Sequence, residues 1–370
     1  MKVDSYNLNE LDNQIQNPNK DLVFCAFDRI SGSEGLYNQL KTKYKNANIV
    51  IFSTSGHFVS SEILDETPIV SAIEFENSSI TMDQFSIADF ATSFDLGESI
   101  GKSIKKEVKG VCIISDGGLI NGTELISGIN ANVLKEVPIF GGMAGDGTRF
   151  QKTLVGANQN PEVGNVVIIQ FFGEGISIKS NSDFGWTSLG LEFKITKSES
   201  NKLIEIDKKN AYDVLYEFLA PESEEKFAEL TLYYPFLLKD SSDEGVIRTP
   251  ILVNHKEKTL VYAGNMPEGS MVKLMKSGTM QLLDSTLEVA QKCVLSKEEN
   301  SFVLAISCVG RRVVLEDMAN EEFTEIQSIF GERSCYFGFY SYGEFSRSGF
   351  EENCKLHNQT LTLAVLQETI

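Results

Sequence analysis

The stretch VPIFGGMAGDGTRF, residues 137–150, joins a β-like apolar run to the most glycine-dense part of the chain. Four glycines fall within seven residues: Gly141, Gly142, Gly145 and Gly147. Glycine is favoured where the backbone adopts positive φ angles or where another group approaches it closely. The stretch therefore predicts either a tight corner packed against a neighbouring strand, or a pocket wall in which main-chain amides and Asp146 contact a ligand.

These glycines do not have the spacing of a nucleotide-binding loop. A dinucleotide site uses G-x-G-x-x-G between a strand and a helix, whereas the order here is G-G-x-x-G-x-G. A Walker loop needs Gly-Lys-Ser/Thr, and the stretch contains no lysine. The residues that follow, TRFQKTLVGANQ, lack a helical apolar period, so we expect no helix N-terminus to bind phosphate there. The loop is not predicted to bind a nucleotide.

The composition of the whole chain limits its partners. The 370 residues are 42% hydrophobic and 23% charged, which is typical of globular proteins and enough for two domains. The formal charge of −19 repels phosphate backbones and anionic lipid, so we expect no nucleic-acid partner. No apolar run reaches the length of about 18 residues that spans a bilayer, so we expect no membrane insertion.

The N-terminus and the cysteines both predict a cytoplasmic protein. The first twenty residues are polar and lack the apolar region of a signal peptide. Of the six cysteines, Cys25, Cys112 and Cys308 lie inside apolar strand-like runs, and none forms a C-x-x-C pair. We interpret these three as buried, reduced thiols.

Apolar periodicity predicts alternating strands and helices, and hence a mixed α/β (α+β) fold. Strands are expected at residues 21–27 and 108–117, and a β-rich region at 164–207. No tandem repeat of fixed short period is visible. We place a domain boundary in the polar, proline-containing segment APESEEKF at 220–227. The predicted organisation is a polar tail (1–20) and two mixed-sheet domains with flanking helices (21–220 and 221–370) that share one ligand pocket.

Three parts of the chain resemble, in order and spacing, the FIST family of bacterial and archaeal sensory domains. The first is VPIFGGMAGDG at 137–147. The second is DFGWTSLGLEFKITKSESNKLIEIDKKNAYDVLYEFL at 183–219. The third comprises SCVGRR at 307–312, GFYSYGEF at 338–345 and HNQTLTL at 357–363. The resemblance covers nearly the whole chain from about residue 20, and it rests on five motifs in the order of the family.

The resemblance implies a function in signal transduction. It implies a FIST N-terminal domain, a FIST C-terminal domain and a small ligand such as an amino acid or other small anion, with output through a partner protein. Some members resemble haem-binding nitric-oxide sensors that regulate a histidine kinase or a cyclic-di-GMP enzyme. Haem is therefore the alternative ligand, and such an enzyme is the expected signalling partner.

The C-terminal motifs contain the candidate ligand contacts. Arg311 and Arg312 open a predicted helix after a strand, where a guanidinium favours an anion. Alternatively, one arginine pairs with a structural acid such as Glu316 and the other faces water, a reading favoured for Arg312. Tyr340, Tyr342 and Glu344 are predicted to share one face of a strand. That face suits an amino-acid-like ligand, and it equally suits the outer side of a half-exposed sheet.

His357 is predicted to face inward, because leucines alternate with it along its strand. It is then either a hydrogen-bonded structural histidine or, if haem binds, its axial ligand. The other two histidines, His57 and His255, are expected to be more exposed. The full set of predicted ligand-binding residues is Gly141, Gly142, Gly145, Asp146, Arg311, Tyr340, Tyr342, Glu344 and His357.

Enzymatic activity is not expected from this sequence. It contains no G-x-S-x-G nucleophile elbow and no H-E-x-x-H metal motif. Asp116 stands at the end of a predicted strand, where pockets occur. A metal-independent hydrolase with a lone serine, cysteine or threonine nucleophile is the remaining alternative.

Overall fold

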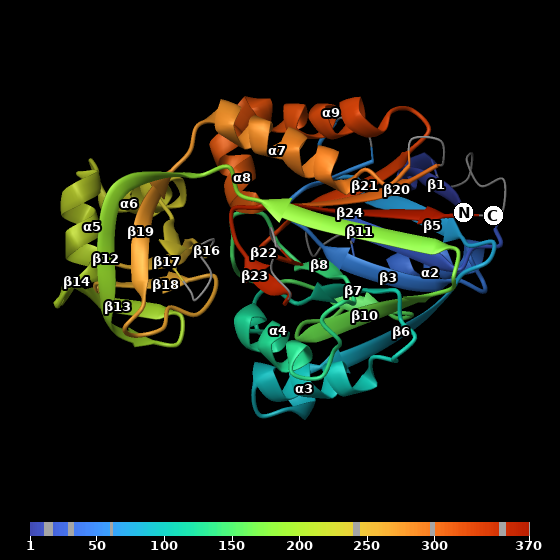
Figure 1. Cartoon of the computed structure of the whole chain (residues 1–370), viewed down its shortest axis with the longest axis horizontal. Coiled ribbons are helices and arrows are strands. Elements are labelled where there is room, and N and C mark those ends of the chain that lie inside the picture. Colours follow the sequence, from blue (N-terminus) through green and yellow to red (C-terminus); the bar gives the residue numbers. More distant parts are fainter. Residues whose placement is uncertain are drawn as a thin grey trace.

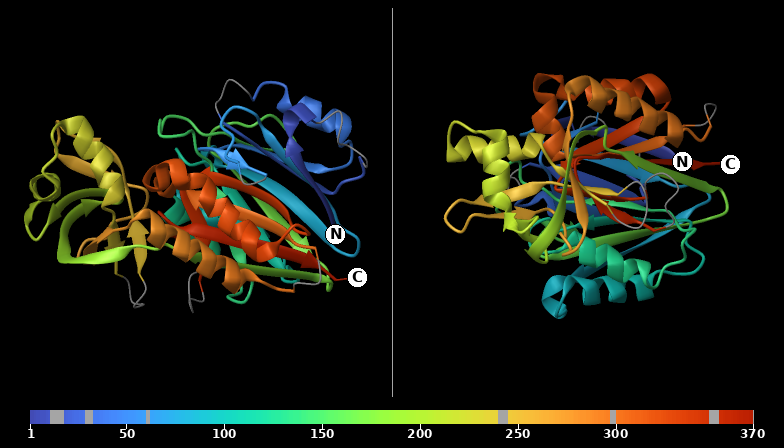
Figure 2. Two further views of the ribbon diagram at one scale, coloured as in Figure 1. Left: turned by 90° about the horizontal axis from the view of Figure 1, so that it is seen from above. Right: turned by 60° about the vertical axis from the view of Figure 1, so that its left-hand side comes forward.

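The structure, a computed structural model, describes residues 1–10, 18–28, 33–59, 62–239, 245–296, 300–347 and 353–369. It consists of a large body and a smaller lobe, residues 187–276, which projects from one end of the body (Figure 1). The two termini lie side by side at the opposite end of the body (Figures 1 and 2). The mixture of helices and mixed sheets confirms the predicted α/β fold class. Among the described residues, no helix combines the length and the apolar character needed to cross a bilayer.

The body contains three copies of one structural pattern. In each copy two parallel strands are joined through a helix, a short strand then leaves the sheet, and an antiparallel strand completes it. The first copy comprises β1 (Lys2–Asn7), β2 (Leu22–Phe27), α2 (Leu36–Lys43), β3 (Asn48–Ser53), β4 (His57–Phe58) and β5 (Ile69–Glu74). The second comprises β6 (Ser79–Ser86), α3 (Ser93–Ser103), β7 (Gly110–Ser115), α4 (Gly122–Asn130), β8 (Ile139–Met143), β9 (Val155–Ala157) and β10 (Asn165–Phe172). The third comprises β11 (Ile176–Asp183), α7 (Thr279–Cys293), β20 (Phe302–Cys308), α8 (Val309–Leu315), α9 (Ala319–Phe330), β21 (Cys335–Ser341), β22 (Gly343–Ser346), β23 (Lys355–His357) and β24 (Leu361–Glu368).

The three sheets have the same strand order, and they exchange one strand cyclically. The orders are β1-β5-β2-β3-β9, β6-β10-β7-β8-β22-β23 and β11-β24-β20-β21-β4. The short strand after β3 pairs with β21, the one after β8 pairs with β3, and the one after β21 pairs with β8. The exchange ties the three copies into one body and gives it a pseudo-threefold axis.

Three main-chain hydrogen bonds close a ring at that axis. The donor and acceptor pairs are Ser55 N to Tyr340 O at 2.9 Å, Tyr342 N to Met143 O at 3.1 Å, and Gly145 N to Ser53 O at 3.1 Å. The ring requires backbone groups and no particular side chain.

The inner faces of the three sheets share one hydrophobic core. Phenylalanines from every copy meet there: Phe24, Phe52, Phe140, Phe171, Phe302, Phe337 and Phe339. The outer faces are covered by α2, by α3 with α4, and by α7 with α9 (Figure 1). Helix α4 illustrates why these segments are helical, since Asn121 caps its first amides while Leu125 and Ile129 face the core.

The lobe is an insertion into the third copy, between β11 and α7. It comprises β12 (Thr187–Glu199), β13 (Lys202–Ile206), β14 (Lys209–Asn210), α5 (Ala211–Leu219), α6 (Glu224–Tyr233), β15 (Phe236–Leu238), β16 (Val246–Arg248), β17 (Pro250–Asn254), β18 (Thr259–Tyr262) and β19 (Met271–Lys276). It has its own hydrophobic core. Short 3-10 helices at Leu8–Glu10, Ile87–Asp89 and Glu316–Met318 complete the described secondary structure.

Two predicted segments contain regular structure. The segment 220–227, where we place a domain boundary, leads into α6 of the lobe, because Ser223 caps that helix through the Lys226 amide. The polar tail 1–20 includes β1, which pairs antiparallel with β5. Of the rest of that tail, residues 11–17 lie outside the described residues.

Candidate functional site

An open cleft of about 460 Å³ lies close to the pseudo-threefold axis, where segments of all three copies meet. We call it the charged cleft, because two arginines and three carboxylates line it: Asp28, Asp65, Arg149, Arg312 and Glu316. Ser55, Gly147 and Thr148 complete its polar wall, and Val309 and Val313 its apolar wall.

Arg312 is held on the α8 side of the charged cleft. Its two terminal nitrogens donate to the carboxylate of Asp65, each at 2.7 Å, and one also donates to the Ser55 carbonyl at 2.6 Å. Its guanidinium lies 5.4 Å from the ring centre of Tyr340. This fork–fork geometry with a carboxylate is the geometry in which an arginine also binds the carboxylate of a ligand.

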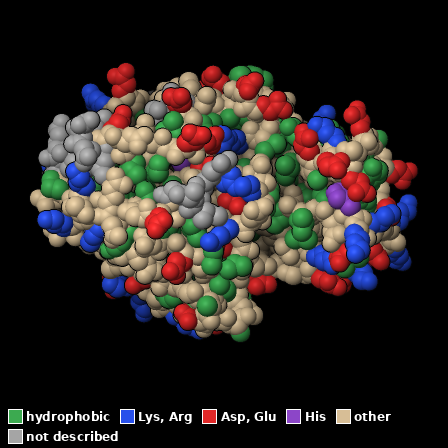
Figure 3. Space-filling view, turned by 180° about the vertical axis from the view of Figure 1, so that it is seen from behind, with side chains coloured by type: hydrophobic (Ala, Val, Ile, Leu, Met, Phe, Trp, Pro, Cys, Tyr) green, Lys and Arg blue, Asp and Glu red, His purple; other side chains and the backbone are tan. Residues whose placement is uncertain are grey.

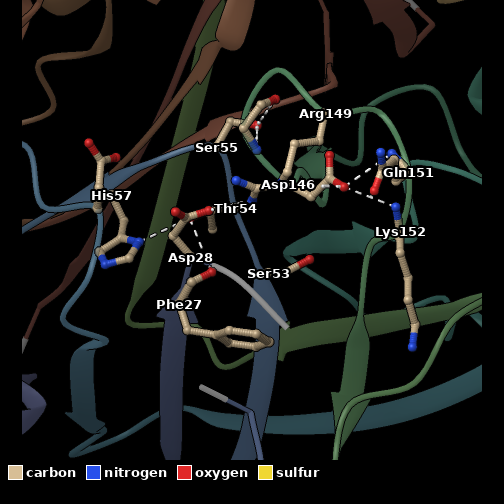
Figure 4. A network of polar contacts seen from close by, with 12 residues as sticks. Phe27, Asp28, Ser53, Thr54, Ser55, His57, Asp146, Arg149, Gln151 and Lys152 are labelled. Atoms are coloured by element: carbon tan, nitrogen blue, oxygen red, sulfur yellow. Dashed lines mark hydrogen bonds and ion pairs between the residues drawn. The ribbon is translucent and has the colours of Figure 1, made fainter. Parts of the chain in front are cut away.

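Arg149 occupies the opposite side, on the segment that follows the glycine stretch. Its guanidinium donates to Asp28 at 3.1 Å and lies 4.0 Å from the carboxylate of Asp146 (Figure 4). Arg149 is about one third exposed, whereas Asp28 is nearly buried. The cleft therefore presents cationic and anionic groups from separate copies of the repeat.

The loop that carries Arg149 is folded around the buried carboxylate of Asp146. One oxygen accepts from the amides of Gln151 at 3.1 Å and Lys152 at 2.9 Å (Figure 4). The other oxygen accepts from the Tyr342 hydroxyl, which also receives the Phe150 amide. Because burial and this carboxylate both disfavour the phenolate, the pKa of Tyr342 is raised. Asp146 thus shapes the cleft wall and does not itself line the cavity.

Glu316 connects the cleft with the lobe. Its carboxylate accepts from the hydroxyl of Tyr233, at the end of α6, at 3.1 Å. The same hydroxyl lies 3.3 Å from the Val313 carbonyl. Glu316 has a φ angle of 50°, an uncommon value for a residue other than glycine. The end of α8 is therefore both a wall of the cleft and a contact of the lobe.

Arg311 does not reach any cavity lining. Its side chain is completely buried and donates to Glu322 at 2.7–2.8 Å. Further acceptors are the carbonyl of Leu282 and the hydroxyl of Thr286. The alternative reading, in which one arginine pairs with a structural acid, describes Arg311, but the acid is Glu322 and not Glu316.

Tyr340, Tyr342 and Glu344 do not share one strand face, contrary to the prediction. The strand breaks at Tyr342, so Tyr340 belongs to β21 and Glu344 to β22 of another sheet. Tyr340 packs among residues of α7 and α9, and Tyr342 among those of α4 and β8. Of these three side chains, Tyr342 is the one that donates a hydrogen bond to Asp146, another residue of the predicted site.

Glu344 is a buried structural acid. It accepts hydrogen bonds from Ser341 and from the Thr360 hydroxyl, the latter at 2.7 Å. Desolvation by burial raises its pKa to about 8. In the sheet it lies between Gly142 and His357, so these three predicted residues are neighbours, but no described cavity reaches them.

The two buried histidines do not fit haem ligation. His357 is buried as predicted, and its Nε2 lies 3.1 Å from the Ser346 carbonyl, with no described cavity beside it. Burial lowers its pKa to about 4. His57 was expected to be exposed and is instead fully buried, with its two nitrogens bonded to Thr54 and Thr67. His255 is partly exposed on the lobe. A haem would need an open face that neither buried histidine offers.

The glycines of the opening stretch are required by close packing. A Cβ atom on Gly141, whose φ is 145°, would lie 1.9 Å from the Ile113 carbonyl oxygen. One on Gly142 would lie 2.7 Å from a methyl of Ile306, and one on Gly145 would lie 2.2 Å from the Ser55 hydroxyl. These contacts correspond to the tight-corner interpretation, and Gly147 is the glycine of the stretch that lines the cleft.

Sequence reasoning missed Asp28, Asp65 and Arg149, and it favoured a role without ligand contact for Arg312. The signal for Asp28 was its position directly after a strand, the same position that drew attention to Asp116. Nothing in the sequence connects Asp65 with α8, because 247 residues separate it from Arg312.

Two family models match most of this chain. The FIST N domain matches residues 21–209, and the FIST C domain matches residues 211–347. An uncharacterized protein of Methanocaldococcus jannaschii is 24% identical over 230 residues, which cover 59% of this chain and 43% of that relative. The chain therefore spans less than half the length of that curated relative. The crystal structure of cyanuric acid hydrolase from A. caulinodans aligns with a TM-score of 0.39 at 7% identity, covering 100% of this chain and 99% of the hydrolase.

Proposed function

The chain belongs to the FIST family, whose domains are small-ligand sensory domains of signal transduction, and on that premise we propose that it is a cytoplasmic sensor of an amino acid. The charged cleft is the proposed binding site. The expected output is a change in the position of the lobe, read by a partner such as a histidine kinase or a cyclic-di-GMP enzyme.

The proposal rests on the pairing of opposite charges in one open cleft. An α-amino acid carries a carboxylate and an ammonium a short distance apart. Arg312 and Arg149 supply two guanidiniums for the carboxylate, and Asp28, Asp65 and Glu316 supply acceptors for the ammonium. Because Arg312 and Asp65 are partly exposed, the ligand can exchange with their mutual ion pair at little loss of stability.

The route from the cleft to the lobe passes through the end of α8. A ligand ammonium that bonds Glu316 competes with the contact between Glu316 and Tyr233 of the lobe. A ligand shifts the lobe only if it binds one arrangement better than the other, and typical coupling energies are about 1–3 kcal/mol. One weak hydrogen bond at this position has the right magnitude for such a switch.

The test is a thermal-shift screen of the purified chain with the twenty common amino acids, followed by calorimetric titration of any that stabilises it. We expect one chemical class to bind saturably, and Arg312→Gln to abolish the binding. Arg333→Gln is the matched control, because Arg333 lines other surface hollows and does not line the charged cleft. Failure of every amino acid to bind, or binding that survives Arg312→Gln, would overturn the proposal.

A further inference from the structure

A second cavity, of about 280 Å³, lies between the body and the lobe. We call it the seam cavity. The loop after Asp146 lines both hollows, since residues 147–149 face the charged cleft and residues 150–153 face the seam cavity. From the lobe, Ile251, Tyr262 and Ala263 close the other side. Seen from behind, the lobe stands apart from the body along its lower edge (Figure 3).

Among the described residues, no carboxylate side chain lines the seam cavity, although the chain has a net charge of −19. Lys152 is the charged residue of this lining, and none of the described carboxylates forms a salt bridge with it. Its side chain extends away from Asp146 (Figure 4). Gln151 adds a side-chain amide, whereas the lining amides of Asn121 and Asn201 already donate to Asn265 and to the Tyr262 carbonyl. This set of groups favours a ligand with one negative charge.

Like Asp146, whose carboxylate accepts from the Gln151 and Lys152 amides, the buried acid Asp116 behind the wall is occupied by hydrogen bonds. It accepts hydrogen bonds from the amides of Gly118 at 2.8 Å, Leu119 at 2.6 Å and Gly164 at 3.1 Å. The Thr153 hydroxyl donates a fourth, at 2.8 Å. These donors hold the negative charge of Asp116 away from the cavity and fix the turn that forms its floor.

The apolar part of the wall is flat. The ring of Phe150 stacks on the ring of Tyr342, with centroids 4.6 Å apart and planes 24° apart. The Tyr342 hydroxyl is bonded to the Asp146 loop, so the cavity receives the ring and not the hydroxyl. Ile120 and Met143 extend this surface. An aromatic ring of a ligand can pack on such a wall.

Few polar contacts hold the lobe against the body at this seam. Asn121 donates to Asn265 at 2.7 Å, and the Asn265 amide donates to Thr123 at 3.3 Å. Arg248 of the lobe donates to the Leu356 carbonyl at 3.0 Å. A molecule in the seam cavity would touch both sides at once, and so would add to these contacts.

We propose that the seam cavity is a second ligand site, separate from the charged cleft, that binds a small aromatic carboxylate and thereby holds the lobe against the body. The ring lies on the Phe150–Tyr342 wall, and the carboxylate meets Lys152 and the Gln151 side-chain amide at the rim. This site does not depend on amino-acid binding in the charged cleft.

The test compares three probes with the same ring and linker: 3-phenylpropionate, 3-phenylpropanamide and 3-phenylpropylamine. Titration of the full chain is followed by calorimetry and by the fluorescence of Trp186, the single tryptophan, which lies at the junction of body and lobe and donates to the Gln359 carbonyl. We expect saturable binding of the acid, weaker binding of the amide, and none of the amine. Lys152→Gln should lower the affinity for 3-phenylpropionate about fivefold, as expected for a solvent-screened ion pair.

Two further variants separate this site from its neighbour. Ala263→Leu fills the cavity from the lobe and should abolish binding, provided that the circular dichroism and melting temperature show a folded lobe. Arg312→Gln should leave binding of the acid unchanged, even though it disables the charged cleft. Equal binding of acid and amine, no saturable binding of the acid, or no effect of both Lys152→Gln and Ala263→Leu would overturn the proposal.

Discussion

Arg311 of the buried cluster and Arg312 of the charged cleft are adjacent in the sequence, but their ion pairs differ in burial. Arg312 pairs with Asp65 at a partly exposed surface, where water can replace either partner. Arg311 pairs with Glu322 where both side chains are completely buried. An exposed pair can be exchanged for a ligand, whereas a buried pair must remain intact for the protein to fold. The comparison teaches that burial, and not residue type, separates a candidate binding group from a structural one.

The largest expected effect comes from breaking each pair in turn. Arg311→Ala leaves Glu322 buried without its cation, and we expect it to lower the free energy of unfolding by about 3–5 kcal/mol. Arg312→Ala leaves Asp65 partly hydrated, and we expect a loss of no more than about 1 kcal/mol. Urea denaturation of the two variants measures the difference. Equal losses would contradict the distinction, and Arg311→Met combined with Glu322→Met should recover part of the stability.

The buried acid Glu344 should make the stability of the protein depend on pH. Because its pKa is raised to about 8, folded Glu344 keeps a proton that the unfolded chain releases above its ordinary value of 4.5. The stability contributed by this group is therefore present at low pH and lost as pH rises toward 8. We expect the unfolding free energy to fall by about 2 kcal/mol between about pH 6 and 7.5 from this group alone.

Glu344→Gln should remove this slope, as measured by urea denaturation at several pH values. Burial lowers the pKa of both His57 and His357. Because the unfolded chain then binds protons more readily, these two groups lower the unfolding free energy as pH falls below the ordinary histidine value of 6.5. His357→Gln is therefore a suitable control, since it should change the acid side of the profile only. An unchanged slope in Glu344→Gln would show that another group titrates.

A smaller effect is expected from the loop that the two cavities share. Tyr342→Phe keeps the ring stacked on Phe150 but removes the hydroxyl that bonds Asp146, and we expect a loss of about 1–2 kcal/mol. Hydrogen exchange should become faster at the amides of Gln151 and Lys152, which Asp146 anchors. In the control Tyr336→Phe, which loses a hydrogen bond to the Gly331 carbonyl, these amides should keep their wild-type rates.

The smallest change in stability is expected where the cleft meets the lobe. Tyr233→Phe removes one hydrogen bond to Glu316, and we expect a loss of no more than about 1 kcal/mol. Its effect on signalling should be larger, because the response of Trp186 fluorescence to an amino acid bound in the charged cleft should weaken while the affinity stays within about twofold. If affinity and response fall together, Tyr233 contacts the ligand and does not transmit its binding.

The sequence allowed some features of the site to be predicted, but not others. The arginine pair opens α8 directly after β20, as predicted, and the glycine stretch lies where the three copies meet. The prediction selected Arg311 and not Arg312 for the ligand site, because side chains of adjacent helical residues point in directions about 100° apart and the helix packing was unknown. The break at Tyr342 was invisible because strand alternation assumes a continuous strand.

By itself, the sequence determined the α/β class, the family and the inward-facing strands, because apolar periodicity and glycine positions are local properties of the chain. The tertiary structure alone decided the threefold arrangement of the body, the lobe as an insertion, and the partners of each charged group. These features depend on main-chain hydrogen bonds between distant strands and on burial, and neither leaves a fixed pattern of side chains in the sequence.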